Sequence, residues 1–572
     1  MTLRRRPDAR WEASAPPDAA AAEALASALS IPPTLAQLLV ARGHGAEAGA
    51  KRFLRPDLDQ LHEPGLMAGM ADAVDRLSRA VRDGEMIVVH GDYDVDGMCS
   101  TALLTRTLRG LGARVTPFIP DRTRDGYDLG PAGVEAARSV GAGLVLTCDC
   151  GTTAVQAGRD LAAAGIDLII SDHHLPGPEL PQAVAILNPR RVDDTSPDKD
   201  LAAVGVAFKL ATALTTALGG NQNVVLNQLD LVALATVADV APLRGENRVF
   251  VRRGLALMRE TKNLGLRALI RSSGLDGKEI TVGRVGFILA PRLNALGRID
   301  SALLGVDLLL TERDDEALSI ARHCEERNRE RQELDRTILD GVLRRVDALD
   351  ADSTWGIALA DTSWHPGVIG IVASRVVEQT GRPAFLVAVN DGVGKGSGRS
   401  IPAFDLHAAL TSCAELLVKY GGHRAAAGLT IEPSRMDEFA ERFNEVARER
   451  LTADDLMRVV RVDLELPLAN ATVEMERALR HFEPFGVGNP GPTFSARGVR
   501  LATSATRIGA DGVKCMVDAP GGPIEAVGWG LAPRASVLRA GATVDLAYKL
   551  ERNTFRGADR LQLGIVDFRP AA

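Results

Sequence analysis

Residues 86–97 read MIVVHGDYDVDG, and this stretch decides both the fold and the chemistry that we expect. The apolar run Met86–Val89 is short and rich in β-branched residues, which predicts a buried strand of a parallel sheet. In an extended segment alternate side chains lie on one face, so the polar groups after the strand should point the same way until the chain turns at Gly97. The four groups on that face are His90, Asp92, Asp94 and Asp96.

The charge of the octet at residues 90–97 implies a bound cation, because four such groups repel one another without one. An imidazole with carboxylates suits Mn²⁺, Fe²⁺ or Zn²⁺, whereas carboxylates alone suit Mg²⁺. An EF-hand loop fits poorly, since Leu103 stands where its bidentate Glu belongs and a strand precedes the loop. An Asp-rich turn that caps a helix stays open for the octet taken alone.

Two further predicted strands also end in acidic or imidazole groups. Leu144–Thr147 runs into CDCG at residues 148–151, and Leu168–Ile170 runs into SDHH at residues 171–174. Another acid, Asp239, ends an apolar predicted helix. Each feature alone is explained by a helix cap or a turn. Open α/β sheets bind ligands at the carboxyl ends of their strands, so together they predict a two-metal site that brackets a phosphate.

These four segments resemble the motifs of the DHH phosphoesterase superfamily, which takes its name from the third motif. The resemblance implies two metal ions, Mn²⁺ (or Mg²⁺). The ligands of one ion would be His90, Asp94 and Asp149. The ligands of the other would be Asp96, Asp149, His173 and Asp239. Asp172 would support the ligands. The residues expected to act in catalysis are His174, which would face the scissile phosphate, Asp149 and Asp92.

The expected mechanism follows from two adjacent cations. Held about 3.5–4 Å apart, such ions lower the pKa of a bridging water, and the hydroxide attacks phosphorus in line. The metals and His174 would stabilise the charge that develops on the phosphate and on the leaving 3′ oxygen. No protein nucleophile is required, so we interpret Cys148 and Cys150 as small buried neighbours of Asp149.

Two glycine-rich segments narrow the choice of substrate. Residues 392–400 read GVGKGSGRS, which is not a Walker A loop, because Gly396 stands where Ser or Thr must follow the Lys. Residues 421–428 read GGHRAAAG, in which small residues let the backbone approach a phosphate closely. An ordinary turn or surface loop stays open for both.

Both segments, and the PRLNALGR stretch at residues 291–298, resemble the RecJ exonucleases, a family within the superfamily. Residues 421–423 are similar to a substrate loop that the superfamily's pyrophosphatases lack. By this resemblance Ser397 and Arg399, joined by Arg122, would bind a terminal 5′ phosphate. The residues expected to contact DNA are Arg122, Arg292, Asn294, Ser397, Arg399, Gly421, Gly422 and His423.

The order of segments predicts an α/β fold, with a parallel-sheet DHH domain and a smaller α/β DHH-associated domain joined by a long helix. In the C-terminal region short strand-like segments alternate with turn residues, which predicts a small β-barrel. Residues 482–490 resemble the entry to the OB fold of the RecJ family, and this resemblance implies that the barrel is an OB fold. In that barrel Phe494, Trp529 and Phe555 are either core residues or stacking platforms for bases. The expected domains are an N-terminal helical segment at 1–80, the DHH catalytic domain at 81–312, the connecting helix at 313–348, the DHH-associated substrate-binding domain at 349–455 and the OB fold at 456–572.

Composition excludes several classes of protein. The formal net charge of −7 over 572 residues argues against a uniform basic coat, although a basic groove can be local. The 6 cysteines are scattered, which disfavours a disulfide-built secreted domain and indicates a reducing compartment. No run of about 18 uncharged apolar residues occurs, so we expect no membrane span and a cytoplasmic, nucleoid-associated protein.

The interpretation that unites these features is a 5′-3′ exonuclease specific for single-stranded DNA, which releases 5′ mononucleotides in DNA recombination and repair. Its polarity rests on the family resemblance. The expected partner is a single strand with a 5′ end, and a helicase and a single-strand-binding protein are candidate partners. A DHH-type phosphodiesterase acting on short RNA or dinucleotides is one alternative, against which the OB-like domain argues. A catalytically silent single-strand-binding replication factor is another, against which the complete ligand set argues.

Overall fold

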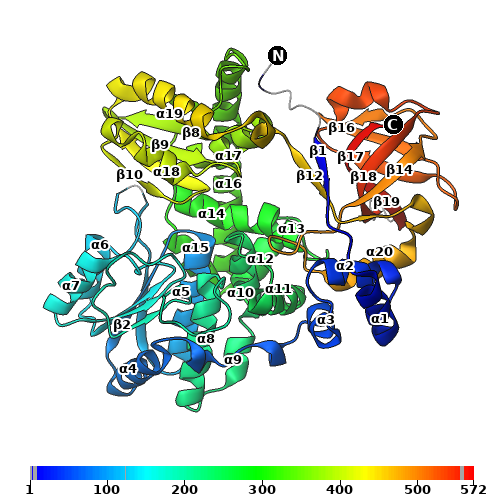
Figure 1. Cartoon of the computed structure of the whole chain (residues 1–572). Coiled ribbons are helices and arrows are strands. Elements are labelled where there is room, and N and C mark those ends of the chain that lie inside the picture. The colour runs from blue at the N-terminus through cyan, green and yellow to red at the C-terminus, as the bar shows by residue number, and fades with distance from the viewer. Residues whose placement is uncertain (1–2, 4–8, 123, 554–558, 572) are drawn as a thin grey trace. The chain divides into compact units, whose positions relative to one another are not determined.

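The computed structural model describes residues 3, 9–122, 124–553 and 559–571 (Figure 1). Their contacts divide the chain into two units. The catalytic unit, as we call it, comprises Arg52–Glu330 and Phe482–Gly491. The second unit comprises Met1–Lys51, Arg331–His481 and Pro492–Ala572.

A five-stranded parallel sheet forms the centre of the catalytic unit, with the strand order β3-β2-β4-β5-β6. Three of these strands, β2, β4 and β5, coincide with the predicted apolar runs. The edge strand β3 was not predicted, because its half-buried residues include Pro117 and give no continuous apolar signal. The strands are β2 (Met86–Gly91), β3 (Arg114–Phe118), β4 (Leu144–Cys148), β5 (Asp167–Ser171) and β6 (Ala185–Leu187).

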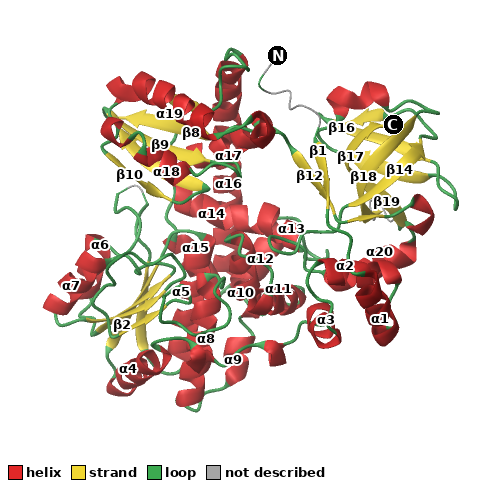
Figure 2. Cartoon of the chain, in the orientation of Figure 1, coloured by secondary structure: helices red, strands yellow, loops and turns green. Residues whose placement is uncertain are grey.

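Helices cover both faces of this sheet (Figure 2). Alternate residues of β2 serve different cores: Ile87 and Val89 pack with α4, α5 and α8, whereas Val88 packs with α6 and α7. Because both faces are covered, the strands read as continuous apolar runs rather than as alternating ones. The covering helices are α4 (Met70–Asp83), α5 (Val95–Gly110), α6 (Pro131–Ser139), α7 (Val155–Ala163) and α8 (Ala203–Ala217).

A helical layer completes the catalytic unit, and its central helix α10 (Leu229–Ala238) has the predicted bounds. The domain boundary expected at residue 80 falls inside α4. The other elements of this layer are α9 (Gln222–Leu226), α11 (Gly245–Met258), α12 (Leu264–Ser272), α13 (Val282–Arg284), the π-helix η3 (Val285–Leu289), α14 (Ala290–Ile299) and α15 (Leu303–Leu310).

The long helix α16 (Asp314–Asp347) lies where a connecting helix was predicted, and it belongs to both units. Its first part buries Ala317, Ala321 and Cys324 in the core of the catalytic unit. Its last part buries other residues, from Ile338 to Val346, in the core of the second unit. The spacing of three and four residues in each part places these side chains on one helical face.

The second unit contains a five-stranded mixed sheet with the order β10-β11-β9-β8-β7, in which only β7 and β8 pair in parallel. Helices α17 (Ile369–Thr380), α18 (Leu406–Thr411) and α19 (Met436–Arg450) accompany it. The strands are β7 (Ile357–Asp361), β8 (Ala384–Asn390), β9 (Val393–Arg399), β10 (Lys419–Gly422) and β11 (Ala426–Ile431).

The C-terminal part of this unit forms a seven-stranded sheet with the order β13-β14-β18-β19-β17-β16-β15. Before it, β12 (Val459–Val462) pairs in parallel with β1 (Arg10–Ala13), so the N-terminal segment is not purely helical. The strands of the large sheet are β13 (Leu464–Glu465), β14 (Phe494–Arg500), β15 (Thr506–Ile508), β16 (Gly512–Val517), β17 (Ile524–Gly528), β18 (Thr543–Asn553) and β19 (Arg560–Pro570). The remaining α-helices described are α1 (Ala19–Leu29), α2 (Pro33–Ala41), α3 (Glu47–Leu54) and α20 (Val473–Leu479).

Among the described residues, no helix is both long enough and apolar enough to cross a membrane.

Candidate metal centre

The first acidic motif lies in the turn between β2 and α5. The strand ends at Gly91 and the helix begins at Val95, so the expectation that one extended segment presents four side chains up to Gly97 is wrong. The chain turns early because Gly97 packs against the backbone of Asp92, where a Cβ atom would lie 2.3 Å from the Asp92 carbonyl oxygen. Asp94 caps α5: its Oδ1 accepts from the amides of Asp96 at 2.8 Å and Gly97 at 3.1 Å. The helix-cap interpretation is therefore correct, and it coexists with the cluster described below.

The second motif holds Asp149 in a conformation that L-residues rarely adopt. Its φ is +63°, which costs roughly 1–3 kcal/mol for a residue other than Gly and is commonest at functional sites. The surrounding loop fixes this conformation, since the Asp149 amide donates to the Ser171 carbonyl at 3.0 Å. The Thr147 hydroxyl also donates to the Cys150 carbonyl at 2.7 Å. These contacts hold the Asp149 carboxylate at the carboxyl edge of the sheet.

The third motif is organised by Asp172. Its Oδ1 accepts from the His173 amide at 2.7 Å and lies 2.8 Å from His174 Nδ1. Burial by itself would raise the pKa of Asp172, but the hydrogen bond and charge of His174 outweigh it and hold that pKa below its ordinary value. Burial lowers the pKa of His174, yet the bond to Asp172 dominates and raises it to about 9. Asp172 therefore orients His174 and favours its protonated form.

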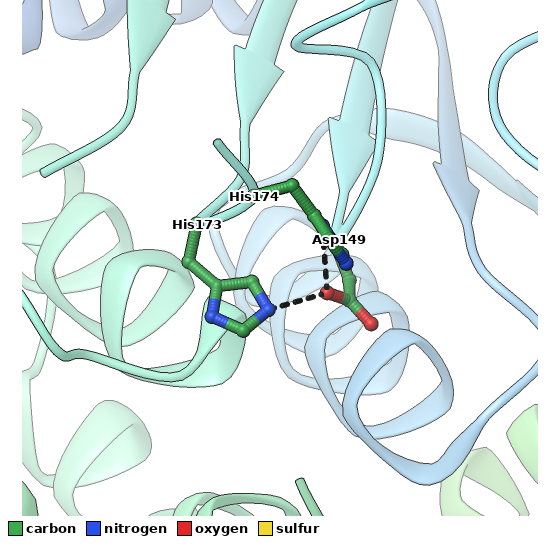
Figure 3. A group of neighbouring side chains, drawn as sticks. All are labelled: Asp149, His173 and His174. Atoms are coloured by element: carbon green, nitrogen blue, oxygen red, sulfur yellow. Dashed lines mark ion pairs between the residues drawn. The ribbon is translucent and has the colours of Figure 1, made fainter. Parts of the chain in front are cut away.

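Three groups of potential ligand atoms meet at this edge, and within each group the atoms lie within 4.8 Å of one another. Figure 3 shows the first group, in which His173 Nε2 lies 3.2 Å and His174 Nδ1 lies 3.8 Å from Asp149 Oδ1. Asp149 and His173 each belong to two groups, which is the arrangement that two neighbouring cations require. The groups are Asp149, His173 and His174; Asp96, His173 and Asp239; and Asp92, Asp94 and Asp149.

Predicted ligand His90 lies outside all three groups. Its ring is fully buried, with Nδ1 3.5 Å from Cys150 Sγ, and α6 packs so closely that a Cβ on Gly133 would lie 2.6 Å from the ring. Burial lowers the pKa of His90 to about 4, so the ring is neutral. A role for His90 as a ligand stays a prediction, and it is Asp92 that the structure brings together with Asp94 and Asp149.

The electrostatics of the cluster fit a divalent cation. Burial and the charge of Asp94 raise the pKa values of Asp92 and Asp149 well above the ordinary range. Burial and the charge of Asp94 also raise the pKa of Asp239 to about 7. Among the described residues, Asp92 Oδ1 and Asp149 Oδ1 are buried without a hydrogen-bond partner. Buried carboxylates are stable only when a cation or hydrogen bonds compensate them, so these oxygens are suited to metal coordination.

The predicted DNA contacts of the catalytic unit have protein partners. Arg292 forms an ion pair of 2.6 Å with Glu325 and donates to the Ile288 carbonyl at 2.6 Å. Asn294 Oδ1 accepts from the Val95 amide at 3.2 Å and so steadies the start of α5. The guanidinium of Arg122 lies 4.8 Å from the centre of the Tyr93 ring, beside the first motif. DNA contact by these three residues stays a prediction.

In the second unit, residues Val393–Arg399 of the GVGKGSGRS segment form strand β9, which rules out the surface-loop alternative for them. Its amides pair with β8 and β11, so they are not offered to an anion. The glycines face the core, where a Cβ on Gly398 would lie 2.4 Å from the Phe385 ring. Ser397 and Arg399 therefore share the other face, and Arg399 Nη1 donates to Ser397 Oγ at 3.2 Å. Next to both is Gly370 of α17, whose Cβ position lies 2.8 Å from Ser397 Oγ.

The GGH motif lies on β10 of the same sheet. Gly421 pairs with Gly428, and Gly428 pairs with Ser397, which places the motif and the predicted phosphate-binding residues in one row across three strands. Gly422 has a φ of +134°, a conformation that only Gly adopts readily. The amide of His423 donates to the Ala426 carbonyl at 2.8 Å and closes the hairpin.

Comparison with known proteins identifies the family. The model of the DHH family N-terminal domain matches residues 86–236, that of the DHHA1 domain matches 353–449, and that of the RecJ OB domain matches 462–567. The single-stranded-DNA-specific exonuclease RecJ of Dickeya dadantii is 38% identical over 596 residues, with 99% of each chain covered. The chain belongs to the RecJ family. This confirms the resemblance and the predicted fold class, including the long helix and the C-terminal OB domain.

Solved RecJ structures agree with the fold. The crystal structure of RecJ from Thermus thermophilus in complex with Mn²⁺ has a TM-score of 0.84 and 34% identity, and the match covers 98% of this chain and 80% of that one. The complex of the same protein with Mg²⁺ has a TM-score of 0.79 and 32% identity, with coverage of 98% and 79%. In the RecJ OB domain of this chain, Phe494 is buried, Trp529 is 64% exposed and Phe555 lies outside the described residues.

Several residues near the metal centre of this RecJ family member were missed by the sequence analysis. Asn188 follows β6 and donates to the His174 carbonyl at 2.8 Å. Like the acids and imidazoles predicted from the sequence, it lies at the carboxyl end of a strand of the parallel sheet, but its amide is neither an acid nor an imidazole. Arg190, two residues on, is close enough for its charge to act on two of these groups. It adds to the burial that lowers the pKa of His173, and it opposes the burial that raises the pKa of Asp239. The Tyr127 hydroxyl lies 3.1 Å from His174 Nε2, and no pattern in the sequence indicated that contact.

Proposed function

We propose that this chain is an exonuclease that degrades single-stranded DNA from the 5′ end and releases 5′ mononucleotides. The observation that carries the proposal is the set of three ligand groups linked by Asp149 and His173, each of which belongs to two of the groups. It occurs in a chain that matches a single-stranded-DNA-specific exonuclease along 99% of both lengths. A catalytically silent binding factor would have no use for this uncompensated acidic cluster.

The ligand groups fit two ions, and the RecJ structures of Thermus thermophilus are complexes with Mn²⁺ and with Mg²⁺. We assign Asp92, Asp94 and Asp149 to one ion. We assign Asp96, His173 and Asp239, again with Asp149, to the other. When bound, the two cations supply Lewis-acid activation of water and neutralise charge on the phosphate.

The chain's own groups orient the substrate around that centre. Asp172 fixes His174 through Nδ1, so a protonated His174 is able to donate from Nε2 to a phosphate oxygen as negative charge grows there. Asn188 holds the backbone of His174 in place. The Tyr127 hydroxyl, 3.1 Å from Nε2, occupies the side from which the phosphate would approach.

A second set of groups serves to anchor the 5′ phosphate. Ser397 and Arg399 lie side by side on one face of β9, and Gly370 packs so closely on them that a Cβ there would lie 2.8 Å from Ser397 Oγ. An Arg guanidinium next to a hydroxyl suits a terminal phosphate, which is doubly charged and accepts several hydrogen bonds. Gly421, Gly422 and His423, in the same row of the sheet, would flank the strand.

This function calls for partners that supply single strands, and we propose a helicase and a single-strand-binding protein for that role. It also places the protein with chromosomal DNA, in the cytoplasm and at the nucleoid, in recombination and repair. A phosphodiesterase for short RNA or dinucleotides is less suited, because the RecJ OB domain extends the binding track beyond a small substrate.

The test uses the full chain with Mn²⁺ and oligonucleotides labelled at the 5′ or the 3′ end, with and without a 5′ phosphate. We expect a 5′ label to appear at once as a mononucleotide, and 3′-labelled strands to shorten stepwise. Duplex DNA with blunt ends serves as the control and should resist. Stepwise loss from the 3′ end, equal digestion of the duplex, or no digestion would each refute the proposal.

A further inference from the structure

The most exposed aromatic side chain among the described residues is Phe287, which is 86% exposed. It lies in the π-helix η3, whose neighbours Val285 and Leu289 are completely buried. Phe287 thus projects from the face opposite to the core. A single exposed apolar residue is common and means little by itself. A π-helical turn, however, is rare and is frequent at functional sites, so its surroundings decide the interpretation.

The segment that carries Phe287 and the helix α14 that follows it pack on two segments that supply groups to the metal centre. Gly286 packs on α10, where a Cβ would lie 3.6 Å from Val237 Cγ1, two residues before the ligand Asp239. Further along, Gly297 of α14 packs so closely on the first motif that a Cβ would lie 1.9 Å from the Tyr93 carbonyl oxygen. Phe287 therefore belongs to a part of the chain that packs directly on the metal-binding segments.

A second apolar side chain is exposed at the same end of α10. Val240 directly follows Asp239, is 60% exposed and has a φ of +62°. A β-branched residue in this left-handed conformation is a true outlier, and such strain persists mainly where function requires it. One exposed apolar side chain thus directly follows Asp239, and the other lies on the π-helix that packs on the same helix, α10. Phosphate and sugar have no use for such groups, but the π-face of a nucleobase does.

We propose that Phe287 is a stacking platform for one base of the single strand bound at the metal centre. This inference rests on the proposed function, because it takes single-stranded DNA as the ligand. A base held there would fix the strand relative to the metals without reading its sequence, since every base has a π-face. Such a platform also disfavours binding of duplex DNA, because the bases of a duplex are already stacked on one another.

The experiment compares wild-type full-length protein with Phe287→Ala and Phe287→Trp. The control is Val224→Ala, which removes a valine exposed on α9 of the same unit. Substrates are 5′-phosphorylated strands with a single abasic residue placed at each of the first several positions in turn. We expect Phe287→Ala to lower kcat/KM on intact DNA by about tenfold, the size of one lost base–aromatic stack, and Phe287→Trp to retain activity.

The decisive arm is the abasic series. One abasic position should cost the wild-type protein a similar factor and cost Phe287→Ala nothing, because the stack is already absent. The melting temperature of Phe287→Ala should equal that of wild type. An identical abasic profile in both proteins, unchanged kcat/KM, or a lower melting temperature would overturn the proposal. Binding of the same strands with Ca²⁺ in place of Mn²⁺ repeats the comparison without cleavage, so stacking is tested even if the proposed activity fails.

Discussion

The two ends of the parallel sheet gather acidic side chains in opposite ways. At the amino end, Glu85 precedes β2 and Asp167 opens β5, and the buried guanidinium of Arg76 lies between them. Arg76 Nη2 lies 2.7 Å from Glu85 Oε2, and its Nε lies 2.5 Å from Asp167 Oδ2. At the carboxyl end, Asp149 faces Asp92 and Asp94, and two of these carboxylates have a buried oxygen without a hydrogen-bond partner among the described residues.

The difference separates a structural acid cluster from a cation site. Burial opposes the charge of Arg76, but Glu85 and Asp167 outweigh it and raise the pKa of Arg76, so the group is permanently ionised. At the carboxyl end, burial and the charges of neighbouring acids raise the pKa values of Asp92 and Asp149 instead. An acid cluster that the protein itself neutralises needs no ligand, whereas one that it leaves charged and buried is built for a cation from solution.

The largest effect is expected when Asp149, which belongs to two ligand groups, is replaced. Asp149→Asn removes a carboxylate that belongs to two ligand groups, so we expect exonuclease activity to fall by at least about 10³-fold, while binding of single strands persists. Activity is measured with end-labelled strands, and binding by fluorescence anisotropy. Asp160→Asn, on α7, is the matched control. Residual activity within tenfold of wild type would remove Asp149 from the centre.

Comparison of the variants Asp92→Asn and His90→Asn tests which of these two residues is a metal ligand. Since Asp92 lies within a ligand group and His90 does not, we expect about a 10²-fold loss for Asp92→Asn and a few-fold loss for His90→Asn. Single-turnover cleavage at saturating Mn²⁺ measures both. The reverse order of effects would make His90 the ligand, as first predicted from the sequence.

Adding Mn²⁺ should stabilise the catalytic unit, because the ions bind at the carboxyl end of its parallel sheet. At Mn²⁺ concentrations near 100 times Kd, binding contributes about 2.7 kcal/mol, so the catalytic unit should melt at a higher temperature with Mn²⁺ than with EDTA. Asp149→Asn should melt higher than wild type in EDTA, because it removes one of the repelling charges, and should gain nothing from Mn²⁺. Differential scanning calorimetry resolves both. Equal gains in the two proteins would contradict the account.

At the amino end, Arg76→Met should act on stability alone. It leaves Glu85 and Asp167 without their cation, and because Asp167 is half exposed we expect a loss of about 2 kcal/mol in urea unfolding. Activity per folded molecule should stay at the wild-type level. The triple variant Arg76→Met, Glu85→Gln, Asp167→Asn should recover part of the loss. Reduced Mn²⁺ affinity in Arg76→Met would show that the two ends are not independent.

The smallest expected effect concerns the proposed phosphate anchor of the second unit. Arg399→Ala should reduce the preference for 5′-phosphorylated over 5′-hydroxyl strands by about tenfold, because a charge-assisted contact is lost. Arg424→Ala, an exposed arginine of the same unit that donates to the Pro402 carbonyl, is the control. The ratio of kcat/KM values for the two strands is the readout. An unchanged ratio in Arg399→Ala would exclude the anchor.

Much of the catalytic unit followed from local patterns in the sequence. The apolar runs at β2, β4 and β5 predicted buried parallel strands, and the strand-end rule then brought Asp149 and His173 to one edge. These features depend on short segments and on one general property of α/β sheets, so they are readable without tertiary information.

The errors arose where distant contacts decide the local structure. The octet turns after Gly91 because of a close approach within the fold, so it is not one extended segment, and Asp92 lies with Asp94 and Asp149 while a role for His90 as a ligand stays a prediction. Strand β9 was not predicted, since alternating glycines give no apolar period. The apolar partners that make it a strand, such as Phe385, come from another part of the chain. Arg190 reaches the centre through a loop whose path the sequence does not reveal.

The most direct test of the central claim is to count the Mn²⁺ ions that the full chain binds. Equilibrium dialysis gives the number, and electron paramagnetic resonance detects coupling between them. We predict two ions per wild-type chain, with the spin coupling of neighbouring sites. Arg76→Met should bind the same number, and Asp149→Asn should show no coupled pair. A wild-type protein that binds one ion or none, or a coupled pair that survives in Asp149→Asn, would contradict the account.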